Sequence, residues 1–267
     1  MFEVAETMSI PSVFGDRLKR WLFALQDYTF LSIQSLANLL TPPQYWGDTL
    51  EQMDLIGVGS LPIVAIAAAF IGGVLVLNTA SQFSRFGMTA LTGEAVSIAL
   101  VRELGPTITA LLVAGRNASG IASELGSMVV TEQIDAMRAL GTDPIRKLMT
   151  PRVLATIFTL PLLVAIADFL GLCGGYLMAF MTLRVGAVQF WTQAINNLAI
   201  GDVVMGMAKP IVFAFIIATI GCYQGLRVRG GTQGVGRATT TAVVISSVSV
   251  LVIDLFLTRF FLYIFGL

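Results

Sequence analysis

Histidine is absent from this chain of 267 residues, and charged side chains are scarce, at 12% of the sequence against about 25% in soluble domains. Without histidine the chain lacks a common general base and metal ligand, and no pair of acids stands at a metal-binding helical spacing. We therefore expect no metal site and no enzymatic activity. The 16 basic residues equal the 16 acidic ones in number and form no basic patch, which argues against binding of nucleic acid.

Cysteine and lysine are also rare. The two cysteines, Cys173 and Cys222, lie in apolar stretches and indicate no disulfide or metal framework. Each of the three lysines follows a residue other than glycine, so the phosphate-binding sequence G-x-x-x-x-G-K-[ST] does not occur. We expect no cofactor in this chain. If ATP drives the protein, a separate subunit binds ATP and magnesium.

Long apolar runs dominate what is present, since 56% of the residues are hydrophobic. A helix needs about 20 apolar residues to cross a bilayer, and five segments meet that length. The sequence therefore predicts an all-α integral membrane protein with spans near residues 55–79, 95–126, 153–182, 203–225 and 238–264.

The N-terminal region has a different pattern. Residues 14–40 place apolar side chains on one helical face and charged ones on the other, which is typical of a helix lying in the membrane interface. A solvent-exposed helix packed on a partner is the open alternative. We divide the chain into an N-terminal interfacial region, 1–45, and a transmembrane domain, 46–267.

The distribution of basic residues predicts the orientation, because cytoplasmic loops carry more lysine and arginine. With the N-terminus inside, three lie outside, and ten lie on the cytoplasmic side: Arg17, Lys19, Arg20, Arg138, Arg146, Lys147, Arg152, Arg227, Arg229 and Arg237. We therefore expect a cytoplasmic N-terminus and an extracytoplasmic C-terminus.

The second span contains charges that a simple anchor would avoid: Arg102, Glu103, Arg116 and Glu124. Each charge at bilayer depth costs about 2.5–3.5 kcal/mol on insertion scales. We expect these side chains to be hidden from lipid in a bundle interior or a wet cavity, which favours transport over anchoring.

The loop after this span predicts a short amphipathic helix. Ile134, Met137 and Leu140 form an apolar row at i, i+3 spacing, and a charged row runs beside it. Gly141 suits a left-handed helix cap. Such a helix fits a groove on a soluble partner, or rests on the lipid headgroups; its residues include Thr131, Glu132, Gln133, Ile134, Asp135, Met137, Arg138 and Leu140.

Several motifs resemble one family. RELGP (102–106), AGR (114–116), EQIDAM (132–137) and DP (143–144) are followed by a pattern entering the fourth span and by GVGRATTTAVV (234–244). The sequence resembles the MlaE/YrbE permeases, which are membrane subunits of Mla- and Mce-type ABC lipid transporters, over roughly residues 50–265. The pattern in the fourth span consists of Asp202, Gly206, Lys209 and Phe213, and Asp254 follows in the fifth.

The resemblance implies a homodimer with an interfacial helix and five spans in the inner membrane. A cytoplasmic ABC ATPase would dock on residues 131–140, and an MCE-domain protein would sit over the periplasmic mouth. Some members also recruit a small STAS-domain subunit. The implied cargo is lipid, usually glycerophospholipid.

Four of the charges fall at similar depth under this topology. We interpret Arg102, Glu103, Lys209 and Asp254 as the lining of a lipid cavity, in which Lys209 or Arg102 meets a phosphate. A purely structural charge network stays open as the alternative. Arg116 and Glu124 are eight residues apart, hence on one helical face, and we interpret them as structural charges.

Three other classes compete with this interpretation. An ion-coupled secondary carrier of an amphipathic substrate could use Glu103, Asp168 or Asp254 to move protons, but five spans show no repeated halves. A lipid-modifying enzyme lacks the required catalytic groups. A scaffold without transport function does not explain charges at bilayer depth.

Overall fold

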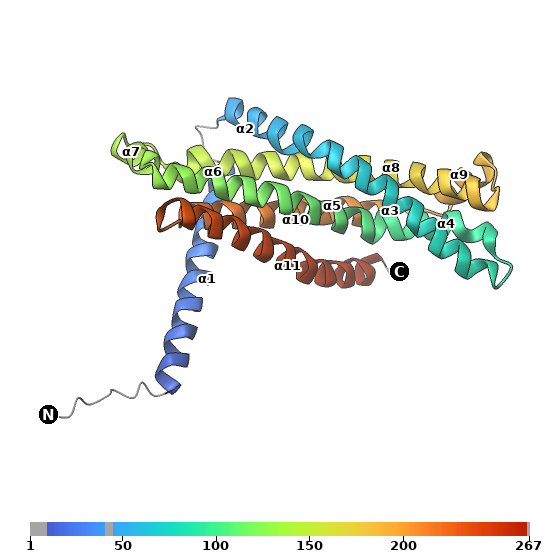
Figure 1. Ribbon diagram of the computed structural model, residues 1–267, viewed down its shortest axis with the longest axis horizontal. Coiled ribbons are helices and arrows are strands. Elements are labelled where there is room, and N and C mark those ends of the chain that lie inside the picture. Colours follow the sequence, from blue (N-terminus) through green and yellow to red (C-terminus); the bar gives the residue numbers. More distant parts are fainter. Residues whose placement is uncertain (1–9, 41–44, 266–267) are drawn as a thin grey trace.

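The computed structural model describes residues 10–40 and 45–265, and all regular secondary structure within these residues is helical (Figure 1). Five helical stretches are long and apolar enough to cross a membrane. The predicted all-α fold with five spans is confirmed.

Each span is longer than the sequence predicted. The first consists of α2 (Trp46–Met53), the π-helical turn η1 (Asp54–Val58) and α3 (Gly59–Ser84). The second runs from α4 (Thr92–Ala99) through η3 (Leu100–Leu104), α5 (Gly105–Val113) and η4 (Ala114–Ala118) to α6 (Ser119–Val130). The third joins η5 (Ile145–Met149) to α8 (Thr150–Leu183), the fourth is α10 (Ile200–Leu226), and the fifth is α11 (Gly231–Phe265).

Glycines let the first and third spans pack closely. A Cβ atom on Gly72 of α3 would lie 1.8 Å from the backbone oxygen of Gly171 on α8, so no larger residue fits there without movement of the helices. Helix α10 lies inside the bundle, with Phe213 and Ile217 fully buried. Helix α11 lies at its edge and leaves a row of large apolar side chains exposed, among them Leu255 and Phe256.

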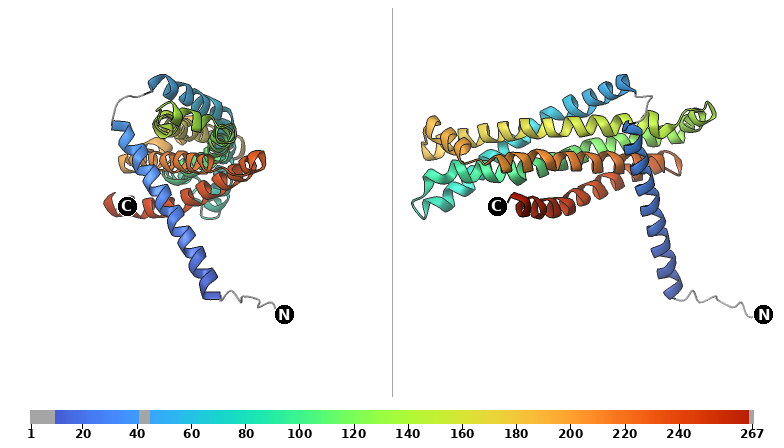
Figure 2. Two further views of the ribbon diagram at one scale, coloured as in Figure 1. Left: turned by 90° about the vertical axis from the view of Figure 1, so that its left-hand side faces the viewer. Right: turned by 180° about the vertical axis from the view of Figure 1, so that it is seen from behind.

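The chain alternates between two ends of this bundle (Figures 1 and 2). At one end, here named the α7 end, lie α7 (Gln133–Ala139) and the turn between α10 and α11. At the other, the α9 end, lie the short helices η2 (Thr89–Leu91) and α9 (Ala187–Asn196) and the end of α11. The predicted orientation assigns the α7 end to the cytoplasm.

Helix α1 (Ile10–Leu40) runs across the direction of the bundle and touches it only near the α7 end (Figures 1 and 2). The hydroxyls of Tyr28 and Thr219 are 2.8 Å apart, and Tyr223 donates a hydrogen bond of 3.0 Å to the carbonyl of Ala24. Phe23 and Phe30 are exposed. The helix exists as expected, while its place in the interface and the domain division at 45/46 stay predictions. Residues 1–9 and 41–44 lie outside the described part of the chain.

Helix α9 was not predicted. Its Phe190 and Ala194 stand one turn apart and are buried with Val96 of α4, so α9 covers the α9 end of the second span. The i, i+4 apolar pair was the available signal, but a segment of ten residues is too short to be found by a search for spans.

Candidate functional site

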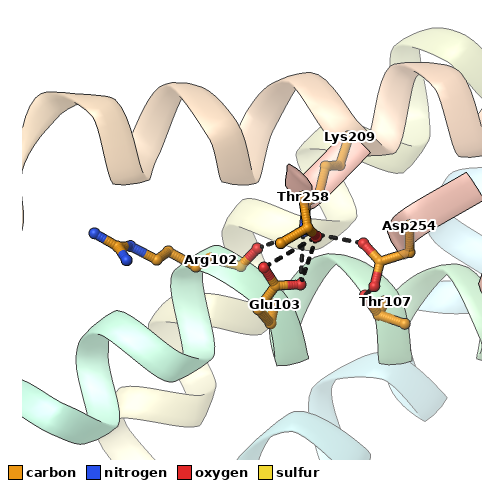
Figure 3. A network of polar contacts seen from close by, with 6 residues as sticks. All are labelled: Arg102, Glu103, Thr107, Lys209, Asp254 and Thr258. Carbon is orange, nitrogen blue, oxygen red and sulfur yellow. Dashed lines mark hydrogen bonds and ion pairs between the residues drawn. The ribbon is translucent and has the colours of Figure 1, made fainter. Parts of the chain in front are cut away.

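The central feature of the bundle is an ion cluster around Lys209 of α10, whose side chain is fully buried (Figure 3). Its Nζ atom lies 2.6 Å from Oε2 of Glu103 and 3.0 Å from Oδ1 of Asp254. It also donates hydrogen bonds to the hydroxyl of Thr258, at 2.8 Å, and to the backbone carbonyl of Arg102, at 3.1 Å. Three of the four predicted residues therefore meet through their side chains.

Two threonines complete the cluster, and neither was predicted from the sequence. Thr258 donates to the carboxylate of Glu103 at 3.2 Å, and Thr107 donates to Oδ2 of Asp254 at 3.1 Å. Thr258 stands four residues after Asp254, and Thr107 four residues after Glu103, so each shares a helical face with a carboxylate. That spacing was the available signal.

Local backbone features explain why Lys209 is held here. Pro106 has no N–H, so the carbonyl of Arg102, four residues earlier, loses its helical partner and accepts the lysine instead. On α10, Gly206 allows a close approach to η3, because a Cβ atom there would lie 2.3 Å from the backbone oxygen of Val101. A proline and a glycine thus place a buried cation against a free carbonyl.

The side chain of Arg102 points away from this cluster (Figure 3). Its guanidinium pairs with Asp202 of α10, which is 1% exposed. Asp202 also accepts a 3.0 Å hydrogen bond from the backbone N–H of Ala199 and so caps the first turn of α10. From the sequence, Asp202 was expected only as part of the family pattern and was not predicted to be the partner of Arg102.

The cluster is sealed on the lysine side and partly open on the carboxylate side. The side chain of Lys209 is 0% exposed, whereas that of Glu103 is 37% and that of Asp254 is 16% exposed. A buried ammonium is tolerated only with charged and hydrogen-bonding partners. The ammonium group of Lys209 is fully engaged by partners in this chain. The side chain of Glu103 is therefore the part of the cluster that is most accessible to another molecule.

Arg116 and Glu124 contact different partners. Glu124 forms an ion pair of 2.7 Å with Arg152, at the start of α8. Arg116 is exposed, and its Nη1 donates to the carbonyl of Leu55 at 3.0 Å and to the hydroxyl of Ser60 at 2.9 Å. Both side chains tie the second span to a neighbouring span, and their interpretation as structural charges stays a prediction.

Asp168 of α8 lies against Gly105, where a Cβ atom would come within 1.7 Å of its Oδ1. This oxygen is buried and has no hydrogen-bond partner among the described residues. A glycine at 105 is therefore required for the helices to pack at this carboxyl.

The helix predicted over residues 131–140 is observed as α7, and the environment of its apolar row changes from one end of the row to the other. Ile134 is buried against the bundle, while Leu140 is 84% exposed. Asp135 and Arg138 form an exposed ion pair of 3.0 Å. Gly141 has φ 76°, and the backbone N–H groups of Gly141 and Thr142 donate to Arg138 and Met137, so the expected left-handed cap is confirmed.

Five apolar spans, a buried ion cluster and a helix protruding at one end define a polytopic membrane protein. The family model described as "Permease MlaE" matches residues 49–260. A probable ABC transporter permease of Rickettsia felis is 39% identical over 95% of this chain and 98% of its own length. A probable ABC transporter permease of Synechocystis is 39% identical over 90% of this chain and 92% of its own length.

This chain belongs to the MlaE permease family. It is the permease subunit of an ABC transporter and is not catalytic, and this class of protein works with a partner ATPase. A further relative is the Arabidopsis thaliana protein named trigalactosyldiacylglycerol 1, chloroplastic, which is 36% identical over 85% of this chain and 65% of the relative.

Proposed function

We propose that this permease moves lipids, with phospholipids as the expected class, between the inner membrane and an extracytoplasmic MCE-domain protein. It works as a homodimer, and its N-terminus is cytoplasmic and its C-terminus periplasmic. The ATPase docks on the exposed residues of α7, and a STAS-domain subunit is a further expected partner. The name of the chloroplast relative contains the name of a glycerolipid, which supports a lipid cargo.

The observation that carries the proposal is the position of the ion cluster. Glu103 and Asp254 lie partly exposed at the edge of the bundle, beside the exposed apolar face of α11 that includes Leu255 and Phe256. A polar group next to an apolar wall suits an amphipathic molecule. When two copies face each other, these surfaces would enclose a cavity with a polar region and an apolar region.

The structure suggests different roles for the four cavity residues. The ammonium group of Lys209 is already paired with carboxylates of this chain. The partly exposed side chains of Glu103 and Arg102 would face the proposed cavity. The ion pair of Arg102 with Asp202 uses Nε. In this arrangement Arg102, whose side chain is 24% exposed, meets a phosphate through its Nη atoms, and Lys209 holds Glu103 in place.

Membership of an ABC permease family argues against an ion-coupled carrier. If ATP drives transport, the motion reaches the spans through α7, whose Ile134 is anchored in the bundle, while Leu140, directly after the helix, projects outward. The helix is thus built to transmit a push from a bound partner to the second and third spans.

A reconstituted complex with the ATPase and an MCE-domain acceptor tests the proposal. We expect ATP-dependent transfer of a fluorescent phospholipid, and we expect Glu103→Gln to reduce its rate at least tenfold. Assembly should persist, because Lys209 keeps Asp254 as a counter-ion. Glu51→Gln, an exposed acid at the start of the first span, is the matched control and should leave transfer unchanged. Transfer that needs no ATP, or that Glu103→Gln leaves intact, would contradict the proposal.

A further inference from the structure

A second polar feature lies between the first and second spans, away from the ion cluster. It is a groove of about 300 Å³ formed by η1 and α2 on one side and by η4 and α6 on the other. We name it the Arg116 groove. Its lining residues are Gln52, Leu55, Ile56, Arg116, Asn117, Gly120, Ile121 and Glu124.

The groove offers hydrogen-bond donors that its one lining acid does not neutralise, because Glu124 forms its ion pair with Arg152 and not with Arg116. All hydrogen bonds of Arg116 to the described residues use Nη1, and both acceptors are uncharged oxygens. Within the described ranges Arg116 has no ion pair. Asn117 is 5% exposed, and its Nδ2 has no hydrogen-bond partner in that part of the chain.

A buried amide donor without a partner costs free energy, and an arginine without an acid at the membrane is also unfavourable. Both costs fall if an anion enters the groove. Arginine presents a planar fork that suits the oxygens of a phosphate, and Nη2 and Nε are the parts of this fork that the chain does not use.

The depth of the groove along the bundle indicates that the phosphate belongs to a lipid headgroup. Ala118, two residues after Arg116, packs against Gly221 of α10, where a Cβ atom would lie 3.3 Å from the Ala118 Cα. Thr219 and Tyr223, on the same stretch of α10, bind α1 through Tyr28 and Ala24. Arg116 is thus level with α1, the helix expected to lie among the headgroups.

The apolar part of the lining fits the rest of a lipid. Leu55 is 53% exposed, and Ile56 and Ile121 lie behind it. A phosphate bound at Arg116 would leave its acyl chains beside the exposed side chain of Leu55. A polar part and an apolar part therefore lie next to each other in this groove, as a phospholipid requires.

We propose that the Arg116 groove binds the phosphate of a membrane phospholipid in the leaflet that α1 occupies, with Arg116 and Asn117 as donors. The inference rests on the proposed function, because the groove would load cargo at the α7 end, separately from the cavity at Glu103. The absence of a side chain at Gly59 leaves room for the guanidinium of Arg116, because a Cβ atom at residue 59 would lie 2.4 Å from Nη2.

Native mass spectrometry of the permease bound to its ATPase, without ATP, tests the inference. The probes are phosphatidylglycerol, diacylglycerol with the same chains, and inorganic phosphate. We expect phosphatidylglycerol to bind better than diacylglycerol. Arg116→Gln should raise its Kd about tenfold, the effect of roughly one charge-assisted hydrogen bond. Arg229→Gln removes an exposed arginine at the α7 end and should change nothing.

A second variant guards against misfolding. Asn117→Asp keeps the oxygen that lies 3.5 Å from the Ser60 hydroxyl, its hydrogen-bond donor, and replaces only the unused amide donor with an anion that repels phosphate. We expect the same weakening of phosphatidylglycerol binding with an unchanged elution volume. Equal binding by wild type, Arg116→Gln and Asn117→Asp would overturn the inference, as would equal losses in Arg116→Gln and Arg229→Gln.

Two other occupants give distinct results. If inorganic phosphate displaces phosphatidylglycerol from wild type but not from Arg116→Gln, the ligand is free phosphate and the lipid inference fails. Gly120→Cys, in a background with Cys173→Ala and Cys222→Ala, reports on a second copy, because a Cβ atom at 120 meets no atom within 4 Å. A disulfide between two copies there would show that the groove is a subunit interface and overturn the inference.

This experiment is independent of the transport assay. A complex that transfers lipid with ATP but binds phosphatidylglycerol without the help of Arg116 would contradict the loading site alone. A complex that binds lipid at Arg116 but never transfers it would contradict the proposed function alone.

Discussion

The ion cluster around Lys209 and the Arg116 groove hold a cation in two different ways. Lys209 is fully buried and has two carboxylates within 3.0 Å, whereas Arg116 is exposed and, among residues 10–40 and 45–265, bonds only to uncharged oxygens. A cation that is paired with acidic side chains of its own chain holds helices together. A cation that is left unmatched at a groove is available to a ligand.

The largest effect is expected from removing the cation of the cluster. Lys209→Met leaves Glu103 and Asp254 facing each other without a counter-ion, which costs about 3–5 kcal/mol when a buried pair is broken. Thermal inactivation of the purified permease, followed by size-exclusion chromatography, measures this loss.

A charge-free cluster provides the control. The triple variant Lys209→Met, Glu103→Gln and Asp254→Asn removes all three charges, and we expect it to recover most of the lost stability because no buried charge is left uncompensated. If the triple variant is as unstable as Lys209→Met alone, the pairing of charges is not what stabilises this region.

A smaller effect is expected from a single methyl group. Gly206→Ala places a Cβ atom 2.3 Å from the Val101 oxygen and separates α10 from η3, for which overpacking costs about 1–3 kcal/mol. The matched substitution in the groove, Gly120→Ala, meets no atom within 4 Å and should leave the melting temperature unchanged or slightly raised. Equal falls in melting temperature for both variants would contradict the view that the cluster is tightly packed and the groove is open.

The smallest effect concerns the ion pair beside the groove. Glu124 is 51% exposed and its partner Arg152 only 5%, but glutamine keeps an oxygen that can accept a hydrogen bond from this arginine. Glu124→Gln should therefore cost less than about 1 kcal/mol. Arg152 keeps its 2.6 Å hydrogen bond to the carbonyl of Leu148. A loss of several kcal/mol in the same thermal assay would mean that a partner or second copy buries Glu124 in the assembled transporter.

The resemblance to a known family and the hydropathy of the chain were enough to predict the all-helical fold, the five spans and the helix at 131–140. The predicted meeting of Glu103, Lys209 and Asp254 is also observed. The prediction was incomplete for Arg102, whose side chain turns to Asp202. It also missed α9 and the four π-helical turns within the spans, because none of these changes the average hydropathy of its segment.

The number of helices that cross the membrane, and which of them carry charge, can be read from the amino-acid sequence, because hydropathy and charge are properties of short segments. Which charges are paired depends instead on how the helices pack. Arg102 and Asp202 are one hundred residues apart, and their meeting depends on how π-helical turns rotate the second span and how closely Gly206 lets α10 approach. The same rotation leaves Arg116 beside uncharged oxygens. The charge of Arg116, unpaired among the described residues, and the paired charges around Lys209 both follow from the packing of the helices and not from their composition.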